Sequence, residues 1–275
     1  MAAEIRLNNY SMQYDLSVLK QILISAARDE LLPRFADVQH NTKADGSFIT
    51  EADLAVQSRV THALQQHYPE TALLGEEMTA DEQAELLHNS ESLWCLDPLD
   101  GTSNFAVGTP YYAISLALIE RGVPTLGIVY DPNRDECFVG LRGQGAFLND
   151  EPLTVKPVSL VLSQCTALID FKRLPPQLAM DLVAQRPYAS QRSYGSVALD
   201  WCWMAASRFH VYLHGASNIW DYSAGQLIFS EAGGCSSTLE GEEIYVNALR
   251  KRSSVGALDQ ATFDQWSGWL REHLG

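Results

Sequence analysis

The chain has 275 residues, 46% of them apolar, and its 19 Lys and Arg against 34 Asp and Glu leave a net charge of −15. This length is enough to bury roughly three quarters of the unfolded surface in one large domain or two lobes. So acidic a surface repels polyanions, which argues against binding to nucleic acid. The chain has no apolar run of about 18 residues and no basic-then-apolar start, so we expect neither membrane insertion nor export.

The five cysteines are isolated from one another and form no C-x-x-C pair. This pattern fits neither a disulfide framework nor a zinc site. We therefore expect reduced, mostly buried thiols in a cytoplasmic protein.

The first half of the chain alternates expected helices and short strands. Apolar residues recur at intervals of three and four over 14–32, which predicts a helix. Thr50 and Asp53 have the spacing of a capping box and predict the start of a second helix. Two apolar runs of strand length each lead into acidic residues. The elements expected here are helices over 14–32, 50–67 and 79–88 and strands over 71–74 and 92–96.

The second half begins with a β-like pattern and continues as α/β. Strands expected over 113–119, 126–130 and 136–139 form an antiparallel meander. The polar, Pro-bearing segment 149–157 is the expected boundary between two lobes, residues 1–150 and 151–275. Beyond it we expect a strand over 167–169 and helices after Pro175 and over 196–206, 222–232 and 261–274.

Acidic residues gather at the ends of expected strands and at the start of a late helix. In open α/β sheets, ligands bind at that edge. Carboxylates that converge there raise one another's pKa and need cations to stay ionised. Oxygen ligands suit hard ions such as Mg²⁺ or Mn²⁺, and the seven histidines lack the spacing of zinc ligands. The carboxylates are those of Glu76, Glu77, Asp97, Asp100 and Asp221.

The hexapeptide at 97–102, D-P-L-D-G-T, is the strongest motif. Pro98 fixes φ and is expected to turn the chain, so that Asp97 and Asp100 face the same side with the Leu99 carbonyl between them. Each of its dipeptides is common in turns. The whole pattern is expected by chance in such a chain with a probability on the order of 10⁻⁴, so we interpret it as functional.

Two residues after this acidic pair could hold an anion. Gly101 has no Cβ, so its N–H and that of Thr102 can approach a phosphate where a short helical turn begins. If Asp53 faces Thr102, its carboxylate accepts the hydroxyl proton and orients that oxygen toward a water. Several of these residues also have structural explanations: Glu76 and Glu77 as solvated surface, Asp53 and Asp221 as helix-start residues, Lys43 as part of a solvated turn, and His214 as a buried side chain.

The order and spacing of these motifs resemble the inositol monophosphatase family of Mg²⁺-dependent phosphatases over nearly the whole chain. The matching segments are 43–45, 50–53, 75–77, 97–105, 127–132, 195–196, 220–225 and 231–234. The resemblance implies an α/β fold of the layered α-β-α-β-α sandwich type, with a metal site between the lobes, and a homodimer. It also implies two or three Mg²⁺ ions, with Mn²⁺ as a substitute, and inhibition by Li⁺.

The resemblance further implies a role for each matching residue. Glu76 and Thr102, the latter backed by Asp53, would position the attacking water, and no phosphoenzyme would form. The implied ligands are Glu76, Asp97 and the Leu99 carbonyl for one metal ion, Asp97, Asp100 and Asp221 for a second, Glu77 for a third, and Gly101 and Thr102 for the phosphate.

The expected substrate is a small sugar, polyol or inositol-type phosphate monoester. Ser196 lies in the segment that lines the alcohol side of the pocket in the family, and His214 stands where inositol-cleaving members carry an acid. Contacts to the substrate are expected from Asp100, Ser196, His214 and Lys43. Alternatives within the family are a histidinol-phosphate phosphatase, a bisphosphate nucleotidase and a catalytically silent metal-binding relative. Outside it, haloacid dehalogenase phosphatases have a D-x-D-G-T loop, with one residue instead of two between the aspartates.

Overall fold

The computed structural model describes residues 14–35, 40–42 and 48–274, so the expected site residue Lys43 lies outside the described residues. In the described ranges, no helix is both long enough and apolar enough to cross a membrane. The α-helices are α1 (Leu16–Ala26), α2 (Glu51–His67), α3 (Ala80–Asn89), α4 (Thr102–Ala106), α5 (Pro176–Ala184), α6 (Val197–Ala205), α7 (Ile219–Glu231) and α8 (Gln260–Glu272).

The strands are β1 (His40–Thr42), β2 (Phe48–Thr50), β3 (Ala72–Gly75), β4 (Ser92–Asp100), β5 (Ala113–Glu120), β6 (Val123–Asp131), β7 (Glu136–Leu141), β8 (Gly145–Leu148), β9 (Glu151–Leu153), β10 (Thr166–Asp170), β11 (Ser190–Arg192), β12 (Val211–Ser217), β13 (Cys235–Ser237) and β14 (Arg252–Ala257). A seven-stranded sheet runs in the order β3-β4-β5-β6-β7-β8-β9, antiparallel except for the β3–β4 pair. A five-stranded sheet has the order β11-β10-β12-β14-β13, with β10 parallel to both neighbours. Strands β1 and β2 pair with each other.

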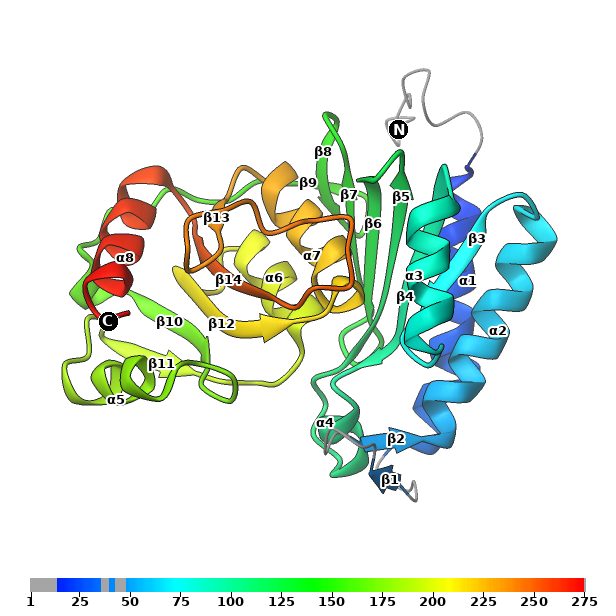
Figure 1. Cartoon of the computed structure of the whole chain (residues 1–275), viewed down its shortest axis with the longest axis horizontal. Coiled ribbons are helices and arrows are strands. Elements are labelled where there is room, and N and C mark those ends of the chain that lie inside the picture. Colours follow the sequence, from blue (N-terminus) through cyan, green and yellow to red (C-terminus); the bar gives the residue numbers. More distant parts are fainter. Residues whose placement is uncertain (1–13, 36–39, 43–47, 275) are drawn as a thin grey trace.

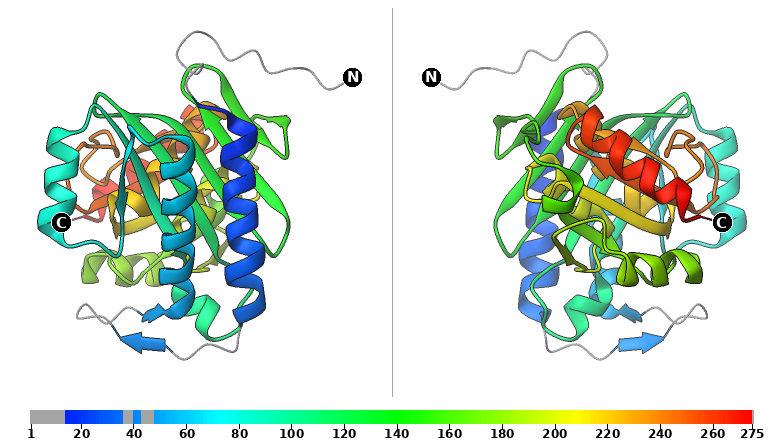
Figure 2. Two further views of the ribbon diagram at one scale, coloured as in Figure 1. Left: turned by 90° about the vertical axis from the view of Figure 1, so that its right-hand side faces the viewer. Right: turned by 90° about the vertical axis from the view of Figure 1, so that its left-hand side faces the viewer.

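The two large sheets and their helices form five layers (Figures 1 and 2). Helices α1 and α2 cover one face of the seven-stranded sheet, and α6 and α7 fill the space between the two sheets. Helices α5 and α8 cover the outer face of the five-stranded sheet. This arrangement confirms the α-β-α-β-α sandwich expected from the sequence.

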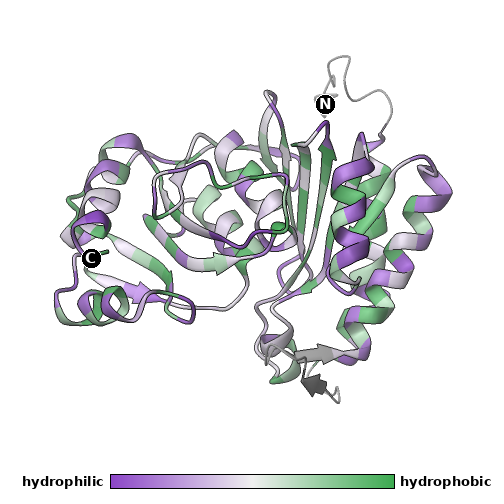
Figure 3. Ribbon diagram, viewed as in Figure 1, coloured by the Kyte–Doolittle hydropathy of each residue, from purple (hydrophilic) through white to green (hydrophobic). Residues whose placement is uncertain are grey.

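Each gap between layers contains its own hydrophobic core. Along β4, Trp94 and Leu96 pack in the core shared with α1 and α2, whereas Leu93 and Cys95 pack in the core shared with α6 and α7. Because β4 is buried on both faces, its residues 93–96 form a continuous apolar run. Figure 3 shows hydrophobic residues along the strands of this sheet and many hydrophilic residues on α2 and α3. All five cysteines are free, and all but Cys235 are buried, as expected.

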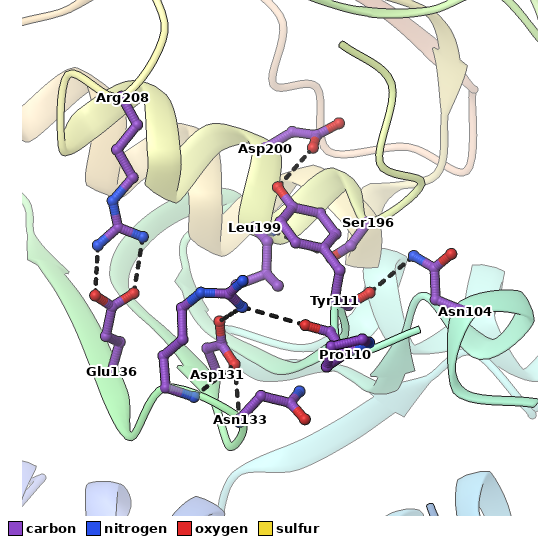
Figure 4. A network of polar contacts seen from close by, with 11 residues as sticks. Asn104, Pro110, Tyr111, Asp131, Asn133, Glu136, Ser196, Leu199, Asp200 and Arg208 are labelled. Atoms are coloured by element: carbon purple, nitrogen blue, oxygen red, sulfur yellow. Dashed lines mark hydrogen bonds and ion pairs between the residues drawn. The ribbon is translucent and has the colours of Figure 1, made fainter. Parts of the chain in front are cut away.

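Polar contacts hold α6 against the seven-stranded sheet (Figure 4). The Tyr111 hydroxyl, just before β5, donates to Asp200 of α6 at 2.9 Å. The Asn104 amide of α4 donates to the Tyr111 carbonyl at 2.8 Å. Beyond the end of α6, Arg208 forms an ion pair with Glu136 of β7. The Tyr111–Asp200 bond and the Arg208–Glu136 ion pair therefore connect α6 and the segment after it to the seven-stranded sheet.

The elements expected from the sequence are confirmed, with differences at their ends. The first helix begins at Leu16 and finishes in a π-helical turn (Ala27–Leu31) and a 3₁₀ turn (Leu32–Arg34). The expected meander continues through β8 and β9, and β9 lies beyond residue 150. The division into lobes at 150 stays a prediction.

Pro98 requires a correction. The sequence predicted a strand that ends at residue 96 and a turn at Pro98, but β4 continues through Pro98 to Asp100. Asp97 lies opposite Ser115 of β5, and Asp100 lies opposite Ala113. Two residues of β4 therefore oppose a single residue of β5, which is a β-bulge. Proline has no N–H to donate, and a bulge is one of the few places where a sheet tolerates it.

Burial in these cores makes a direct stability prediction. Leu23→Ala in α1 empties a fully buried site between helix and sheet, so we expect a loss of about 2–5 kcal/mol in the free energy of unfolding. Leu54→Ala in α2 is the matched control, because Leu54 is 52% exposed and should change stability by less than about 0.5 kcal/mol. Urea unfolding measures both, and equal effects would contradict the layer assignment.

Candidate active site

A single pocket collects residues from the end of β3, the end of β4 and the starts of α4, α6 and α7. Four of the five expected carboxylates line it, although they come from three separate parts of the chain. The lining residues are Glu76, Asp97, Leu99, Asp100, Gly101, Thr102, Ser103, Asn104, Asp170, Lys172, Arg173, Gly195, Val197, His214, Asn218 and Asp221. The structure therefore brings the acidic motifs together as the sequence predicted.

The bulge in β4 directs two aspartates into this pocket. Residues three apart in a regular strand face opposite sides of the sheet, but the extra residue in the bulge lets Asp97 and Asp100 face the same side. The Asp97 carboxylate accepts the Leu99 N–H at 3.0 Å. The Asp100 carboxylate accepts the Ser196 hydroxyl and the Ala198 N–H, both at 2.6 Å, so the start of α6 holds it in place.

Asp221 combines a structural contact with its place in the pocket. It is the third residue of α7, and its carboxylate accepts the N–H of the N-cap residue Asn218 at 2.7 Å. The sequence offered a helix-start role as an alternative to a metal ligand. One carboxylate oxygen closes the capping box, and the residue also lines the pocket, so the two roles are compatible.

Burial and mutual repulsion dominate the electrostatics of the site. Burial raises the pKa of Asp97 well above its usual value, and the charges of Glu76, Asp100 and Asp221 raise it further. Burial likewise raises the pKa of Asp221, with further contributions from Asp100 and Glu76, against the Asn218 N–H and the positive charge of Arg173. Burial raises the pKa of Asp100 to about 6, against the hydrogen bonds from Ser196 and the start of α6. Ionised together, these groups need positive charge beside them.

The start of α4 carries the two residues that the sequence predicted as anion and water contacts, Gly101 and Thr102. Gly101 has a φ of 99°, and a Cβ there would lie 2.9 Å from the Tyr111 carbonyl oxygen, so only glycine fits. The Thr102 hydroxyl lies 3.1 Å from an Asp53 carboxylate oxygen and 3.0 Å from the Leu99 carbonyl, and donates to one of them. Its lone pairs are then left to accept a proton from a water.

Asp53 is held for this contact by its own helix. Its other carboxylate oxygen accepts the Thr50 N–H at 2.8 Å and the Thr50 hydroxyl at 2.6 Å, which completes the predicted capping box of α2. Burial raises the pKa of Asp53, against the hydrogen bonds from Thr50 and Thr102, and the charge of Glu77 raises it slightly. The structural and functional interpretations of Asp53 are again compatible.

The oxygen atoms that line the pocket are the type of ligand that a hard divalent cation prefers. Among the residues that the structure describes, no three His, Cys, Asp or Glu side chains already have the arrangement of a metal site. The pocket nevertheless presents oxygen donors from Glu76, Asp97, Asp100, Asp221 and the Leu99 carbonyl. Three of these carboxylates have raised pKa values from burial. A divalent ion such as Mg²⁺ relieves that penalty, and oxygen is the donor it prefers.

The remaining expected site residues lie in different positions. Ser196 is fully buried, and its hydroxyl contacts Asp100, so the substrate contact expected of it stays a prediction. His214 lines the pocket from β12 and is 4% exposed. Burial lowers its pKa to about 4, so its imidazole is neutral at neutral pH. Glu77 follows Glu76, and its N–H donates to the Gln57 side chain at 3.4 Å.

Sequence reasoning missed three charged residues of the pocket. Asp170, Lys172 and Arg173 line it from the end of β10 and the loop that follows. The signal that singled out the other clusters, charged residues directly after a strand, is present here too. Its two cations set it apart from the acidic clusters, so the pattern of carboxylates after strands did not include it.

Fold and site together define an α-β-α-β-α protein with a carboxylate-lined pocket between its two sheets. Residues 12–266 match the model of the inositol monophosphatase family, and the chain belongs to that family. This confirms the resemblance seen in the sequence and rules against the haloacid dehalogenase alternative.

Similar proteins carry two kinds of name. Inositol monophosphatase 1 of Solanum lycopersicum is 34% identical over 232 residues, covering 82% of this chain and 83% of that protein. Nus factor SuhB of Pasteurella multocida (strain Pm70) is 35% identical over 216 residues, covering 77% and 79%. Among solved structures, the Thermotoga maritima IMPase has a TM-score of 0.79 at 26% identity and covers 95% of this chain and 98% of that chain. These similarities establish the family of the chain but not its substrate.

The raised pKa of Asp97 predicts how stability depends on pH without divalent cations. The pKa of Asp97 is higher in the folded than in the unfolded state, so protonated Asp97 contributes to the free energy of unfolding at low pH. This contribution is lost as the pH rises through the folded-state pKa. Asp97→Asn removes the charge. In EDTA, the free energy of unfolding should be larger for the variant than for the wild type near pH 8. The difference should disappear toward pH 4.

Urea unfolding across this pH range measures the difference, with Glu85→Gln on the exposed side of α3 as the charge-matched control. The control should follow the wild type at every pH. An Asp97→Asn effect that does not vary with pH would contradict the repulsion described above.

Proposed function

We propose that the protein is a Mg²⁺-dependent phosphomonoesterase that hydrolyses a small sugar, polyol or inositol-type phosphate. One observation supports this most directly: the carboxylates of Glu76, Asp97, Asp100 and Asp221 line one pocket together with the Gly101–Thr102 start of α4. Cation ligands and an anion site are thus adjacent. With Glu77, which follows Glu76, five carboxylates and a phosphate dianion total about −7, and two or three Mg²⁺ reduce this to about −3 to −1.

The proposed metal ligands follow from the donors of the pocket and from family membership. Glu76, Asp97 and the Leu99 carbonyl would hold one ion, and Asp97, Asp100 and Asp221 a second. Glu77 would contribute to a third, weaker site. When bound, such ions lower the pKa of water and neutralise the phosphate oxygens.

The chain's own groups would bind the phosphate and direct the water. The backbone N–H groups of Gly101 and Thr102 would donate to phosphate oxygens. Glu76 and the Thr102 hydroxyl, the latter held by Asp53, would orient the water so that its oxygen attacks phosphorus opposite the leaving alcohol. The phosphorus–oxygen bond to the alcohol would then break, one proton of the attacking water would pass to the departing alcohol oxygen, and the water's oxygen would stay on phosphorus as inorganic phosphate.

The alternatives differ in substrate or in activity. A histidinol-phosphate phosphatase or a bisphosphate nucleotidase would use the same carboxylates. A silent metal-binding relative would be expected to have lost a ligand or the water-positioning threonine, whereas Glu76, Glu77, Asp97, Asp100, Thr102 and Asp221 are all present. A homodimer, inhibition by Li⁺, a cytoplasmic location and the lack of a nucleic-acid partner stay predictions from the sequence.

The decisive experiment is phosphate release from a generic monoester as a function of Mg²⁺ concentration. Asp97→Asn removes a ligand shared by both proposed ions, and we expect turnover to fall by about 10³-fold or more while the fold is retained. Glu85→Gln is the control and should match the wild type. No release by the wild type at any Mg²⁺ or Mn²⁺ concentration would favour the silent relative.

The water-positioning role of Thr102 has its own test. Thr102→Ala removes the hydroxyl but none of the proposed carboxylate ligands, so kcat should fall about tenfold to a hundredfold with little change in the Mg²⁺ concentration for half-maximal activity. Thr102→Ser keeps the hydroxyl and should recover most of the loss. If Thr102→Ala is as active as the wild type, the hydroxyl does not position the water.

A further inference from the structure

The pocket has a cationic side that the proposed hydrolysis does not require. Lys172 and Arg173 follow β10 and are the two basic side chains among the described residues that line the pocket. The metal-binding carboxylates come instead from the ends of β3 and β4 and from the start of α7. The chain has a net charge of −15, so two adjacent cations in a pocket lined by carboxylates differ in charge from their surroundings.

The segment that carries these cations is anchored to the neighbouring strand. A Cβ on Gly215 of β12 would lie 2.0 Å from the Arg173 carbonyl oxygen, so the two backbones approach as closely as only glycine allows. The Arg173 guanidinium donates to the Ala216 carbonyl at 3.0 Å. The Asp170 carboxylate accepts the Lys172 N–H at 2.7 Å. The backbone of this segment and the Arg173 side chain are therefore held in place by the fold.

The two charges are available to a ligand. In the part of the chain that the structure describes, neither Lys172 nor Arg173 forms an ion pair with a carboxylate. Lys172 is exposed and Arg173 is partly buried. Asp170, which lies 3.8 Å from the His214 imidazole, offsets one of the two positive charges. The neutral His214 adds no charge, so this side of the pocket keeps a net positive charge.

The proposed ions and the amides at the start of α4 would bind the scissile phosphate without these cations. We propose that the substrate carries a second anionic group, a carboxylate or a second phosphate, on its alcohol part, and that Lys172 and Arg173 bind that group. This inference rests on the proposed phosphatase function and narrows its substrate class. Charge-assisted hydrogen bonds from a lysine and an arginine would make the pocket prefer such an anionic group over a hydroxyl at the same place.

Pairs of matched esters test the proposal. Glycerol 2-phosphate and 2-phosphoglycerate differ only in a hydroxymethyl against a carboxylate, and fructose 1-phosphate and fructose 1,6-bisphosphate differ only in a second phosphate. The wild type should show a higher kcat/KM for the anionic member of at least one pair, and which pair shows it identifies the group. That preference should weaken as salt is raised.

The variants Lys172→Gln and Arg173→Gln should each lower the ratio of kcat/KM, anionic over neutral, by about three- to tenfold, and the double variant by more than tenfold. Arg173→Lys keeps the charge and should recover part of the ratio. Lys156→Gln removes an exposed cation outside the pocket and is the control.

The experiment distinguishes failure of this inference from failure of the phosphatase proposal. Hydrolysis of the neutral esters without any preference for the anionic ones, or a preference that the double variant keeps, would overturn this inference and leave the phosphatase proposal standing. Release from the generic monoester but from none of these four esters would also overturn this inference alone. If the generic monoester is not hydrolysed either, at any Mg²⁺ or Mn²⁺ concentration, the phosphatase proposal fails and this inference falls with it.

Discussion

Repulsion among buried carboxylates is the constraint on which the rest of the site depends. Three of the acidic groups are held by donors from the element that carries them or from a neighbouring one: Asp97 by the Leu99 N–H, Asp100 by the start of α6, and Asp221 by the N-cap of α7. These bonds fix the positions of the carboxylates, but they do not remove the cost of placing like charges together out of water. The pocket is therefore prepared for cations, and a phosphate is the natural partner of the cations it would hold.

The layered fold brings these groups together by placing a helical layer between two sheets. Helices α6 and α7 pack against the seven-stranded sheet on one side and the five-stranded sheet on the other (Figure 1). Their first turns therefore lie beside the end of β4, and the contact of Tyr111 with Asp200 helps to keep them there. The same helices that fill the central core thus carry Asp221 and the donors to Asp100.

Names such as inositol monophosphatase and Nus factor SuhB among similar proteins show that family membership leaves the role of a chain open. In this chain the acidic motifs account for the half of the pocket that would hold metal and phosphate. The side formed by β10, β12 and the Lys172–Arg173 loop differs in charge, and in our proposal it would face the group attached to the phosphate. Substrate choice is therefore expected to depend on the second sheet, while the chemistry depends on the first.

The sequence by itself determined most helices and strands, the family, and the residues of the acidic motifs, because periodicity, capping and a specific hexapeptide are local patterns. It did not predict that β4 continues through Pro98 as a bulge, since a proline between two aspartates has the local signature of a turn. It also missed Lys172 and Arg173, whose place in the pocket follows from the pairing of β10 with β12. Only the tertiary structure decided that Asp53 contacts Thr102 and that Ser196 contacts Asp100, because residues 49 and 96 positions apart meet only through packing.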